Sequence, residues 1–264
     1  MNKLSIALAQ MDIVLGEPMQ NLERARARIN EASERGADVV VLPELWGSAY
    51  DLEHAAAHAT PLESGLFADI ACAAQEQHIA VVGSLLEASE GRVYNTATFV
   101  DARGVCRGVY RKLHLVPMLE EDKYLTPGEE APVFDTAFGL CGLAVCYDLR
   151  FPELWRHYAI GGAVLVFLPS EWPTPRLSHW RTLVPARAIE NQIFIAATNR
   201  VGSGKGERFG GHSMIVNPWG EMLAEGDENE GLLFASIDLD EVQETRRRVP
   251  VFRDRRPQVY SKWA

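Results

Sequence analysis

The stretch Cys141-Gly142-Leu143-Ala144-Val145-Cys146-Tyr147-Asp148-Leu149-Arg150-Phe151-Pro152-Glu153 guides the interpretation of the whole chain. Its apolar first half is typical of a β-strand that ends at Cys146. A short polar turn follows, and Pro152 is favoured in the first turn of a helix. A thiol at such a turn projects from the strand end toward the electropositive amide end of the helix. Cys146 is therefore a candidate nucleophile, although a buried structural cysteine would fit the same position.

Length and charge narrow the possible classes of protein. The chain has 264 residues, 47% of them hydrophobic, which suffices for a single large domain over residues 1–264. The net charge of −10 argues against a nucleic-acid partner, because binding to phosphates requires a basic surface. No apolar stretch approaches the ~18 residues of a membrane span, so no membrane partner is expected.

The number and spacing of the cysteines indicate the cellular compartment of the protein and whether it binds a metal. The four cysteines, Cys72, Cys106, Cys141 and Cys146, form no CxxC pair, so neither a zinc site nor a disulfide scaffold is predicted. The apolar run from Leu4 to Ala9 is too short for a signal peptide. We therefore expect a cytoplasmic protein with reduced thiols and no metal.

The order of the predicted elements indicates an α/β fold. Apolar runs such as Asp38–Leu42 and Val164–Leu168 are typical of buried strands, and they alternate with helical patterns such as Leu66–Gln77. A hairpin is predicted around the turn Asp101–Gly104. This gives about ten strands, which is many for one open sheet, so two stacked sheets covered by helices fit better.

Three local features complete this description of the chain. Asn21 is predicted to cap the first helix. The Gly-rich segment from Val201 to Gly211 is expected to be a surface loop. The tail from Val249 to Ala264 is rich in Pro, Arg and aromatic residues and cannot form a core alone, so it either frays or packs on something else.

Two charged residues accompany Cys146 at predicted strand ends. Glu44 follows an apolar strand, and Lys112 ends the hairpin. Functional groups collect at the carboxyl ends of strands in open α/β sheets. A carboxylate can take the proton of a thiol, and an ammonium can stabilise the oxyanion of a tetrahedral intermediate. Spacing alone does not show that the three residues meet, and each taken singly also fits a surface charge.

Three motifs around these residues resemble the nitrilase (carbon–nitrogen hydrolase) superfamily. Leu42-Pro43-Glu44 resembles its general-base motif, Tyr110–Leu115 its lysine motif, and Cys146–Glu153 its nucleophile motif. The match continues through Ala186–Asn191 and Asn199–Gly202, and covers roughly residues 4 to 240. The resemblance implies a four-layer α-β-β-α sandwich of the nitrilase type, no cofactor, and a homodimer or higher homo-oligomer. The tail from residue 249 is a candidate part of that interface.

The resemblance also implies a Glu-Lys-Cys triad. Glu44 would take the proton of Cys146, whose sulfur would attack an amide carbon. Lys112 and the backbone N–H of Tyr147 would hold the oxyanion. Ammonia would leave, and water activated by Glu44 would hydrolyse the thioester.

Further site residues are carried over from the family's pattern. The family has a second glutamate in the lysine loop, which we assign to Glu120, with Glu121 as the alternative. Tyr50 and Trp172 match positions where the family places residues around its substrate. Arg176 is predicted to bind the distal carboxylate of an acidic substrate, because an arginine fork suits a carboxylate. A surface arginine is an equally good interpretation of Arg176.

The nucleophile motif, together with Glu171–Arg176 and His179-Trp180, is similar to the ω-amidase branch of this superfamily. Those enzymes hydrolyse the side-chain amide of small dicarboxylic acid monoamides such as 2-oxoglutaramate. A small-molecule amide, of the 2-oxoglutaramate or succinamate type, is therefore the expected partner. The alternatives are an aliphatic amidase, an N-carbamoyl amino acid hydrolase or a nitrilase. A catalytically silent binding protein on the same fold is an alternative from a different class.

Overall fold

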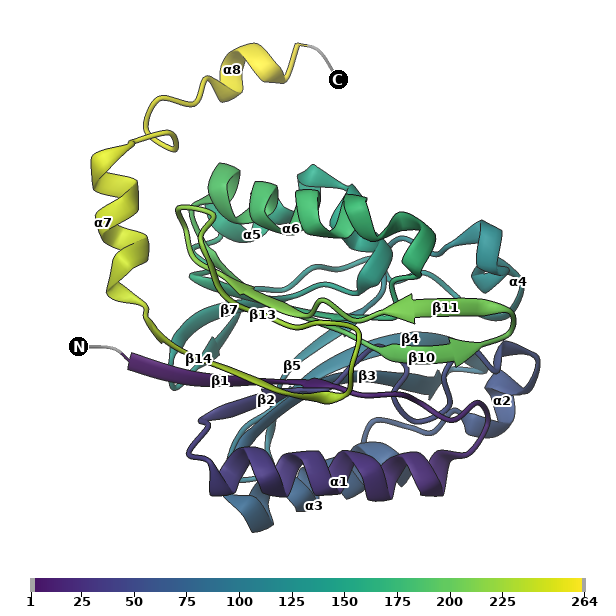
Figure 1. Ribbon diagram of the computed structural model, residues 1–264. Coiled ribbons are helices and arrows are strands. Elements are labelled where there is room, and N and C mark those ends of the chain that lie inside the picture. Colours follow the sequence, from purple (N-terminus) through teal and green to yellow (C-terminus); the bar gives the residue numbers. More distant parts are fainter. Residues whose placement is uncertain (1–2, 263–264) are drawn as a thin grey trace.

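The computed structural model describes residues 3–262 and contains two six-stranded sheets that pack face to face (Figure 1). Across the first sheet the strands are β14 (Gly231–Asp238), β1 (Lys3–Gln10), β2 (Val39–Val41), β3 (Ala80–Ser89), β4 (Arg92–Val100) and β5 (Cys106–Arg111). Across the second they are β13 (Met222–Glu225), β12 (Met214–Val216), β9 (Phe194–Asn199), β8 (Leu165–Ser170), β7 (Gly139–Leu143) and β6 (Phe134–Thr136).

Helices cover the outer face of each sheet (Figure 1). The first sheet is covered by α1 (Pro18–Glu34) and α3 (Gly65–Gln77), and the second by α5 (Pro152–Ile160) and α6 (Leu177–Asn191). This arrangement confirms the predicted four-layer α-β-β-α sandwich. No helix in the described part of the chain combines the length and the apolar composition that crossing a bilayer requires.

The two sheets share an apolar interface and direct their parallel strands toward one end of the molecule. Strands β1, β2 and β3 pair in parallel, as do β7, β8 and β9. Between the sheets, the ring of Phe99 on β4 lies 5.6 Å from that of Phe134 and 5.7 Å from that of Phe167, centroid to centroid. Because this core fixes one sheet against the other, the carboxyl ends of β2, β7, β8 and β9 lie close together.

Two local predictions were wrong. Helix α1 begins at Pro18 rather than after Asn21, whose buried side chain instead donates to the carbonyls of Val14 and Gly47. The Gly-rich segment forms a hairpin of β10 (Val201–Gly204) and β11 (Glu207–Gly210) rather than an irregular loop. Its turn uses left-handed backbone at Gly206, a conformation that costs glycine little.

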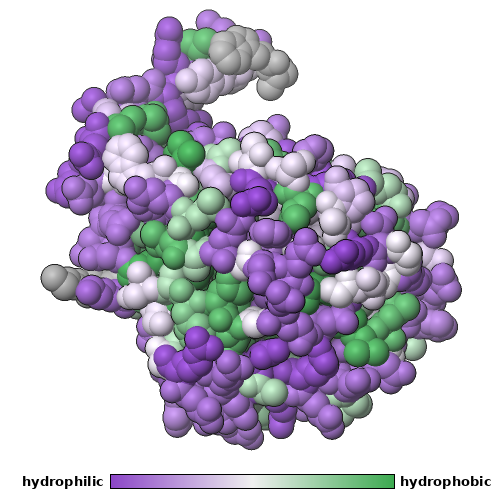
Figure 2. All heavy atoms as spheres, viewed as in Figure 1, coloured by the Kyte–Doolittle hydropathy of each residue, from purple (hydrophilic) through white to green (hydrophobic). Residues whose placement is uncertain are grey.

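Four short or terminal helices complete the chain. Helices α2 (Ala55–His58) and α4 (Glu121–Tyr124) lie near the carboxyl ends of the strands. After α7 (Asp240–Arg248), the segment that carries α8 (Pro257–Tyr260) extends away from the sandwich, as Figures 1 and 2 show. The start of this tail packs on the body, because the guanidiniums of Arg156 and Arg246 lie 5.1 and 5.0 Å from the ring centroid of Phe252.

Candidate active site

Glu44, Lys112 and Cys146 meet between the two sheets. Glu44 follows β2, Lys112 follows β5, and Cys146 follows β7, so each lies just beyond the end of a strand. Lys112 Nζ donates to Glu44 Oε1 at 2.8 Å, and both side chains are completely buried. Cys146 is 4% exposed, and its thiol lies close enough to Glu44 for that carboxylate to raise its pKa. The structure thus brings together three residues that the sequence motifs singled out.

Cys146 lies at a strained turn. Its φ of +46° is in the left-handed region, which a residue with a side chain rarely adopts. Asp148 holds this turn, because its Oδ2 accepts the N–H of Val145 at 2.8 Å and the hydroxyl of Tyr110 at 2.7 Å. The Oδ1 atom of Asp148 lies 2.7 Å from Nδ1 of His114, so His114 helps to hold Asp148 in place. The strand end, the left-handed turn and Asp148 together direct the sulfur into a pocket.

Burial dominates the electrostatics of the triad. It raises the pKa of the Cys146 thiol well above its ordinary value, and the neighbouring Glu44 carboxylate raises it further. Cys146 therefore rests as a neutral thiol, which would need a base before it could act as a nucleophile. Burial alone would lower the pKa of Lys112, but the carboxylates of Glu121 and Glu44 reverse this and raise it well above its ordinary value. Lys112 consequently remains an ammonium.

Four hydrogen-bond donors fix the carboxylate of Glu44. Oε1 accepts from Lys112 Nζ at 2.8 Å, from Asn95 Nδ2 at 2.8 Å and from the hydroxyl of Tyr50 at 3.1 Å. Oε2 accepts the backbone N–H of Glu171 at 3.0 Å. The base is thus held from both sheets, because Asn95 belongs to β4 and Glu171 follows β8.

The second glutamate of the site is Glu121, and the assignment to Glu120 was wrong. Glu121 is buried, and its Oε1 accepts from Lys112 Nζ at 2.7 Å and from the Tyr50 hydroxyl at 2.7 Å. Glu120 has a 56% exposed side chain that pairs with Lys123 at 2.6 Å on the surface. Glu120 has left-handed backbone (φ +62°) and precedes α4, which begins at Glu121, so the two side chains point in different directions.

Tyr50 also differs from its expected place. The sequence predicted a wall of the substrate pocket, but the hydroxyl of Tyr50 contacts Glu44 and Glu121 behind the triad. Its ring borders a side cavity of about 100 Å³ next to Leu119 and Pro173. The contacts of Tyr50 therefore indicate a residue that orients the two carboxylates.

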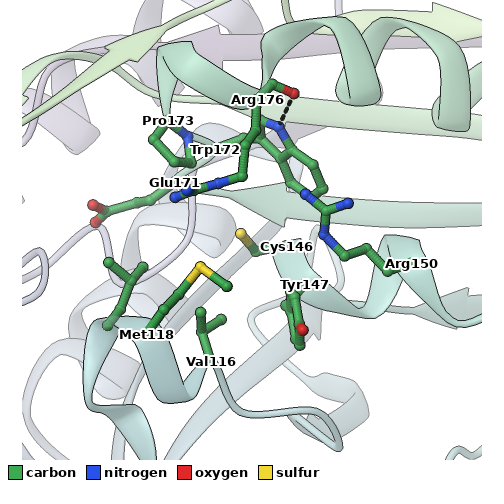
Figure 3. A pocket seen from close by; sticks show the side chains of 10 residues that line it. Val116, Met118, Cys146, Tyr147, Arg150, Glu171, Trp172, Pro173 and Arg176 are labelled. Carbon is green, nitrogen blue, oxygen red and sulfur yellow. Dashed lines mark hydrogen bonds between the residues drawn. The ribbon is translucent and has the colours of Figure 1, made fainter.

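A pocket of about 260 Å³ opens over Cys146 (Figure 3). Tyr147, Trp172 and Arg176, which the sequence analysis assigned to substrate binding, are among the residues that line it. Trp172 is held in place by its indole N–H, which donates to the backbone carbonyl of Arg176 at 2.7 Å. The remaining lining residues are Val116, Met118, Leu119, Arg150, Glu171 and Pro173.

Sequence reasoning missed Arg150. Its guanidinium carbon lies 4.6 Å from the ring centroid of Trp172 and 5.8 Å from that of Tyr147, and it lines the pocket beside the sulfur (Figure 3). Its position in the nucleophile motif could have indicated a role in the pocket. Arg150 lies four residues after Cys146, so the turn keeps the two residues close together. With Arg150 and Arg176, the small pocket has two cationic side chains that suit a carboxylate.

Known proteins resemble this chain over nearly its whole length. It is 41% identical to a 2-oxoglutaramate amidase of Bacillus subtilis (strain 168) over 98% of this chain and 100% of the relative. It is 34% identical to an ω-amidase of Homo sapiens over 99% of this chain and 98% of the relative. These relatives confirm the expected resemblance to the ω-amidase branch.

A solved structure extends the comparison to the fold. An amidase variant from Nesterenkonia sp. AN1 matches with a TM-score of 0.87 and 31% identity, over 99% of this chain and 100% of that one. In that protein, acrylamide is bound to the active-site cysteine by Michael addition. The sequence model described as carbon-nitrogen hydrolase matches residues 5–247. This chain therefore belongs to the carbon–nitrogen hydrolase family.

Proposed function

We propose that this protein hydrolyses the terminal amide of a small dicarboxylic acid monoamide, of the 2-oxoglutaramate or succinamate type, to a carboxylate and ammonia. The supporting observation is the pocket of about 260 Å³ that contains the Cys146 sulfur and two arginines and adjoins a buried Glu44–Lys112 pair. The amide would lie at the sulfur and the distal carboxylate at the arginines. The small volume favours a short substrate.

The first half of the proposed reaction forms a thioester. Glu44 takes the proton of Cys146, and the sulfur forms a bond to the amide carbon. The carbonyl oxygen becomes an oxyanion, which the Lys112 ammonium and the N–H of Tyr147 stabilise. When the carbon–nitrogen bond breaks, protonated Glu44 gives its proton to the leaving nitrogen, and ammonia is released.

The second half restores the enzyme. Glu44 takes a proton from water, whose oxygen attacks the thioester carbon. The carbon–sulfur bond breaks, the sulfur takes the proton back from Glu44, and the carboxylic acid product leaves. Glu121 and Tyr50 keep Glu44 and Lys112 oriented in both halves. Since a reduced thiol is needed throughout, we place the enzyme in the cytoplasm, where thiols stay reduced.

We further propose that two copies of the chain associate through the face of α5 and α6 and the projecting tail. Large apolar side chains are exposed there, among them Ile160 at 52%, Ile189 at 52% and Val249 at 42%. The tail stands away from its own body (Figure 1), so its outer part is positioned to lie on a second copy.

An ammonia-release screen tests the activity. We expect 2-oxoglutaramate and succinamate to release ammonia, and Cys146→Ala to abolish both turnover and fast labelling by iodoacetamide, because the nucleophile is gone. Cys72→Ala, at an exposed thiol, is the control and should retain turnover. Preference for nitriles, or release of carbon dioxide with ammonia from N-carbamoyl compounds, would contradict the amidase proposal. Full activity in Cys146→Ala would contradict the nucleophile.

Adjacent glutamates provide a matched pair of variants. Glu121→Gln is expected to lower kcat/KM by about 10²-fold or more, because a charged partner of Lys112 is lost from the buried site. Glu120→Gln should change it by less than about twofold, since its side chain is exposed. Steady-state kinetics on the best substrate measure both, and a larger loss in Glu120→Gln would reverse the assignment.

Arg176 is tested by substrate comparison. Arg176→Ala should lower kcat/KM for succinamate by roughly 10- to 100-fold, the value of one charge-assisted hydrogen bond, with much less effect on a neutral amide. The control is Arg181→Ala in α6, the helix that begins just after Arg176, because the side chain of Arg181 pairs with Glu225. Equal losses on the acidic and the neutral amide would show that Arg176 does not recognise the carboxylate.

The tail proposal predicts a change in mass. The full chain is expected to be a dimer in light scattering. Truncation after Arg248 should shift its mass toward that of a monomer, because the tail that contacts the second copy is removed. A melting curve of the truncated chain checks that its core still folds. An unchanged mass, or a monomeric full chain, would exclude the tail from the interface.

A further inference from the structure

A second buried ion pair lies beside the triad, and its two side chains have no part in the mechanism described above. Arg200 Nη1 donates to Glu171 Oε2 at 2.8 Å, with the side chains 1% and 0% exposed. Glu171 follows β8 and Arg200 follows β9, so the pair lies at the same end of the second sheet as Cys146. Burying two charges costs free energy of folding. Because buried charges beside an active site often have a functional role, the Glu171–Arg200 pair is a candidate for one.

The pair is connected directly to the catalytic base. The backbone N–H of Glu171 donates to Glu44 Oε2, whereas Lys112 occupies Oε1. Arg200 anchors the Glu171 side chain and is itself fixed by Asp12 Oδ1 and by the carbonyl of Ile13, both at 2.7 Å. A continuous set of contacts therefore runs from the end of β1, through Arg200 and Glu171, to Glu44.

Glu171 also brings a titratable charge close to Glu44. Its Oε1 has no hydrogen-bond partner among residues 3–262, so only one carboxylate oxygen is satisfied. Burial raises the pKa of Glu171 to about 7, although Arg200 opposes this and Glu44 adds to it. The carboxyl therefore loses its proton as the pH rises through neutrality.

The surroundings contain few other charges. Among described residues, Glu44 faces Lys112, Glu121 and Glu171 together with the Tyr50 hydroxyl and the Cys146 thiol. Glu171 faces Arg200, Glu44, Lys112 and the Tyr50 hydroxyl, and it lines the pocket together with Arg150 and Arg176. A change in the charge of Glu171 is thus felt mainly by the base and its ammonium partner.

We propose that the Glu171–Arg200 pair positions Glu44 and that ionisation of Glu171 makes Glu44 a stronger base for the Cys146 proton. Glu171 is a positioning residue in this scheme, since it acts through Glu44. The inference rests on the proposed role of Glu44 as the base. It does not depend on which amide is the substrate.

The wild-type enzyme should show this in its pH profile. The rate of Cys146 labelling by iodoacetamide, and kcat/KM, should rise about 3- to 10-fold through a step near pH 7, because a new negative charge favours the protonated form of Glu44. Below the step Glu171 is neutral and adds no negative charge beside Glu44, so the base is weaker. The Cys146→Ala variant gives the labelling background of the other thiols.

Two variants should change the step in different ways. Glu171→Gln removes the titrating group, so the step should vanish and the rate at pH 8 should fall by the same factor. Arg200→Gln leaves Glu171 without its cation, so ionisation becomes harder and the step should move to higher pH. Glu171→Asp and Arg200→Lys keep the charges and should restore a step. Glu87→Gln is the control, because Glu87 is also buried and bound to an arginine, Arg111, yet does not contact the triad.

Each outcome decides the proposal. Absence of a step in the wild type, or an unchanged step in Glu171→Gln, overturns it. If Glu171→Gln and Arg200→Gln both lose rate equally at every pH and keep the step, the pair has a purely structural role. That result also overturns the proposal. If melting curves show that Glu171→Gln or Arg200→Gln is unfolded, the variant that folds is compared with the substitution that keeps the charge at the same position. That comparison then decides the proposal. A labelling step without hydrolysis of any amide would refute the proposed substrate but support this inference.

Discussion

The Lys112 ammonium lies between two buried carboxylates, and the rest of the site depends on that arrangement. Its Nζ donates to Glu44 Oε1 at 2.8 Å and to Glu121 Oε1 at 2.7 Å, with all three side chains inaccessible to solvent. An unpaired charge in such a place costs several kcal/mol. Each carboxylate therefore requires the ammonium, and the three segments that carry these residues are held in one geometry.

In the proposed reaction, this charge arrangement explains how an unreactive thiol becomes a nucleophile. Two carboxylates and one ammonium give the surroundings of Cys146 a net negative charge. A free thiolate would add a second negative charge there. Transfer of the thiol proton to Glu44 leaves the total charge unchanged, since one anion replaces another. The thiol is therefore activated only together with its base, and the Lys112 ammonium is already in place when charge develops on the substrate oxygen.

The pattern of apolar strands predicted two stacked sheets covered by helices, and the resemblance of three motifs to a known family implied the triad and the four layers. They did not distinguish Glu120 from Glu121, because that choice depends on the left-handed backbone at Glu120 (φ +62°), which turns its neighbour inward. Arg150 was missed because stacking on Trp172 is a contact between distant segments. The hairpin at residues 201–211 was missed because glycine-rich sequence usually disfavours strands.

The two sheets contribute different parts of the site. The first sheet and α4 supply the buried charges, namely Glu44, Lys112 and Glu121, while the segments after β7 and β8 supply Cys146 and most of the pocket walls. Substitutions in those walls can therefore alter which amide fits without disturbing the charges. Glu171 is the exception, because it lines the pocket and also holds Glu44 through its backbone. Substrate recognition and base strength are consequently linked at this residue, and a change there is expected to affect both.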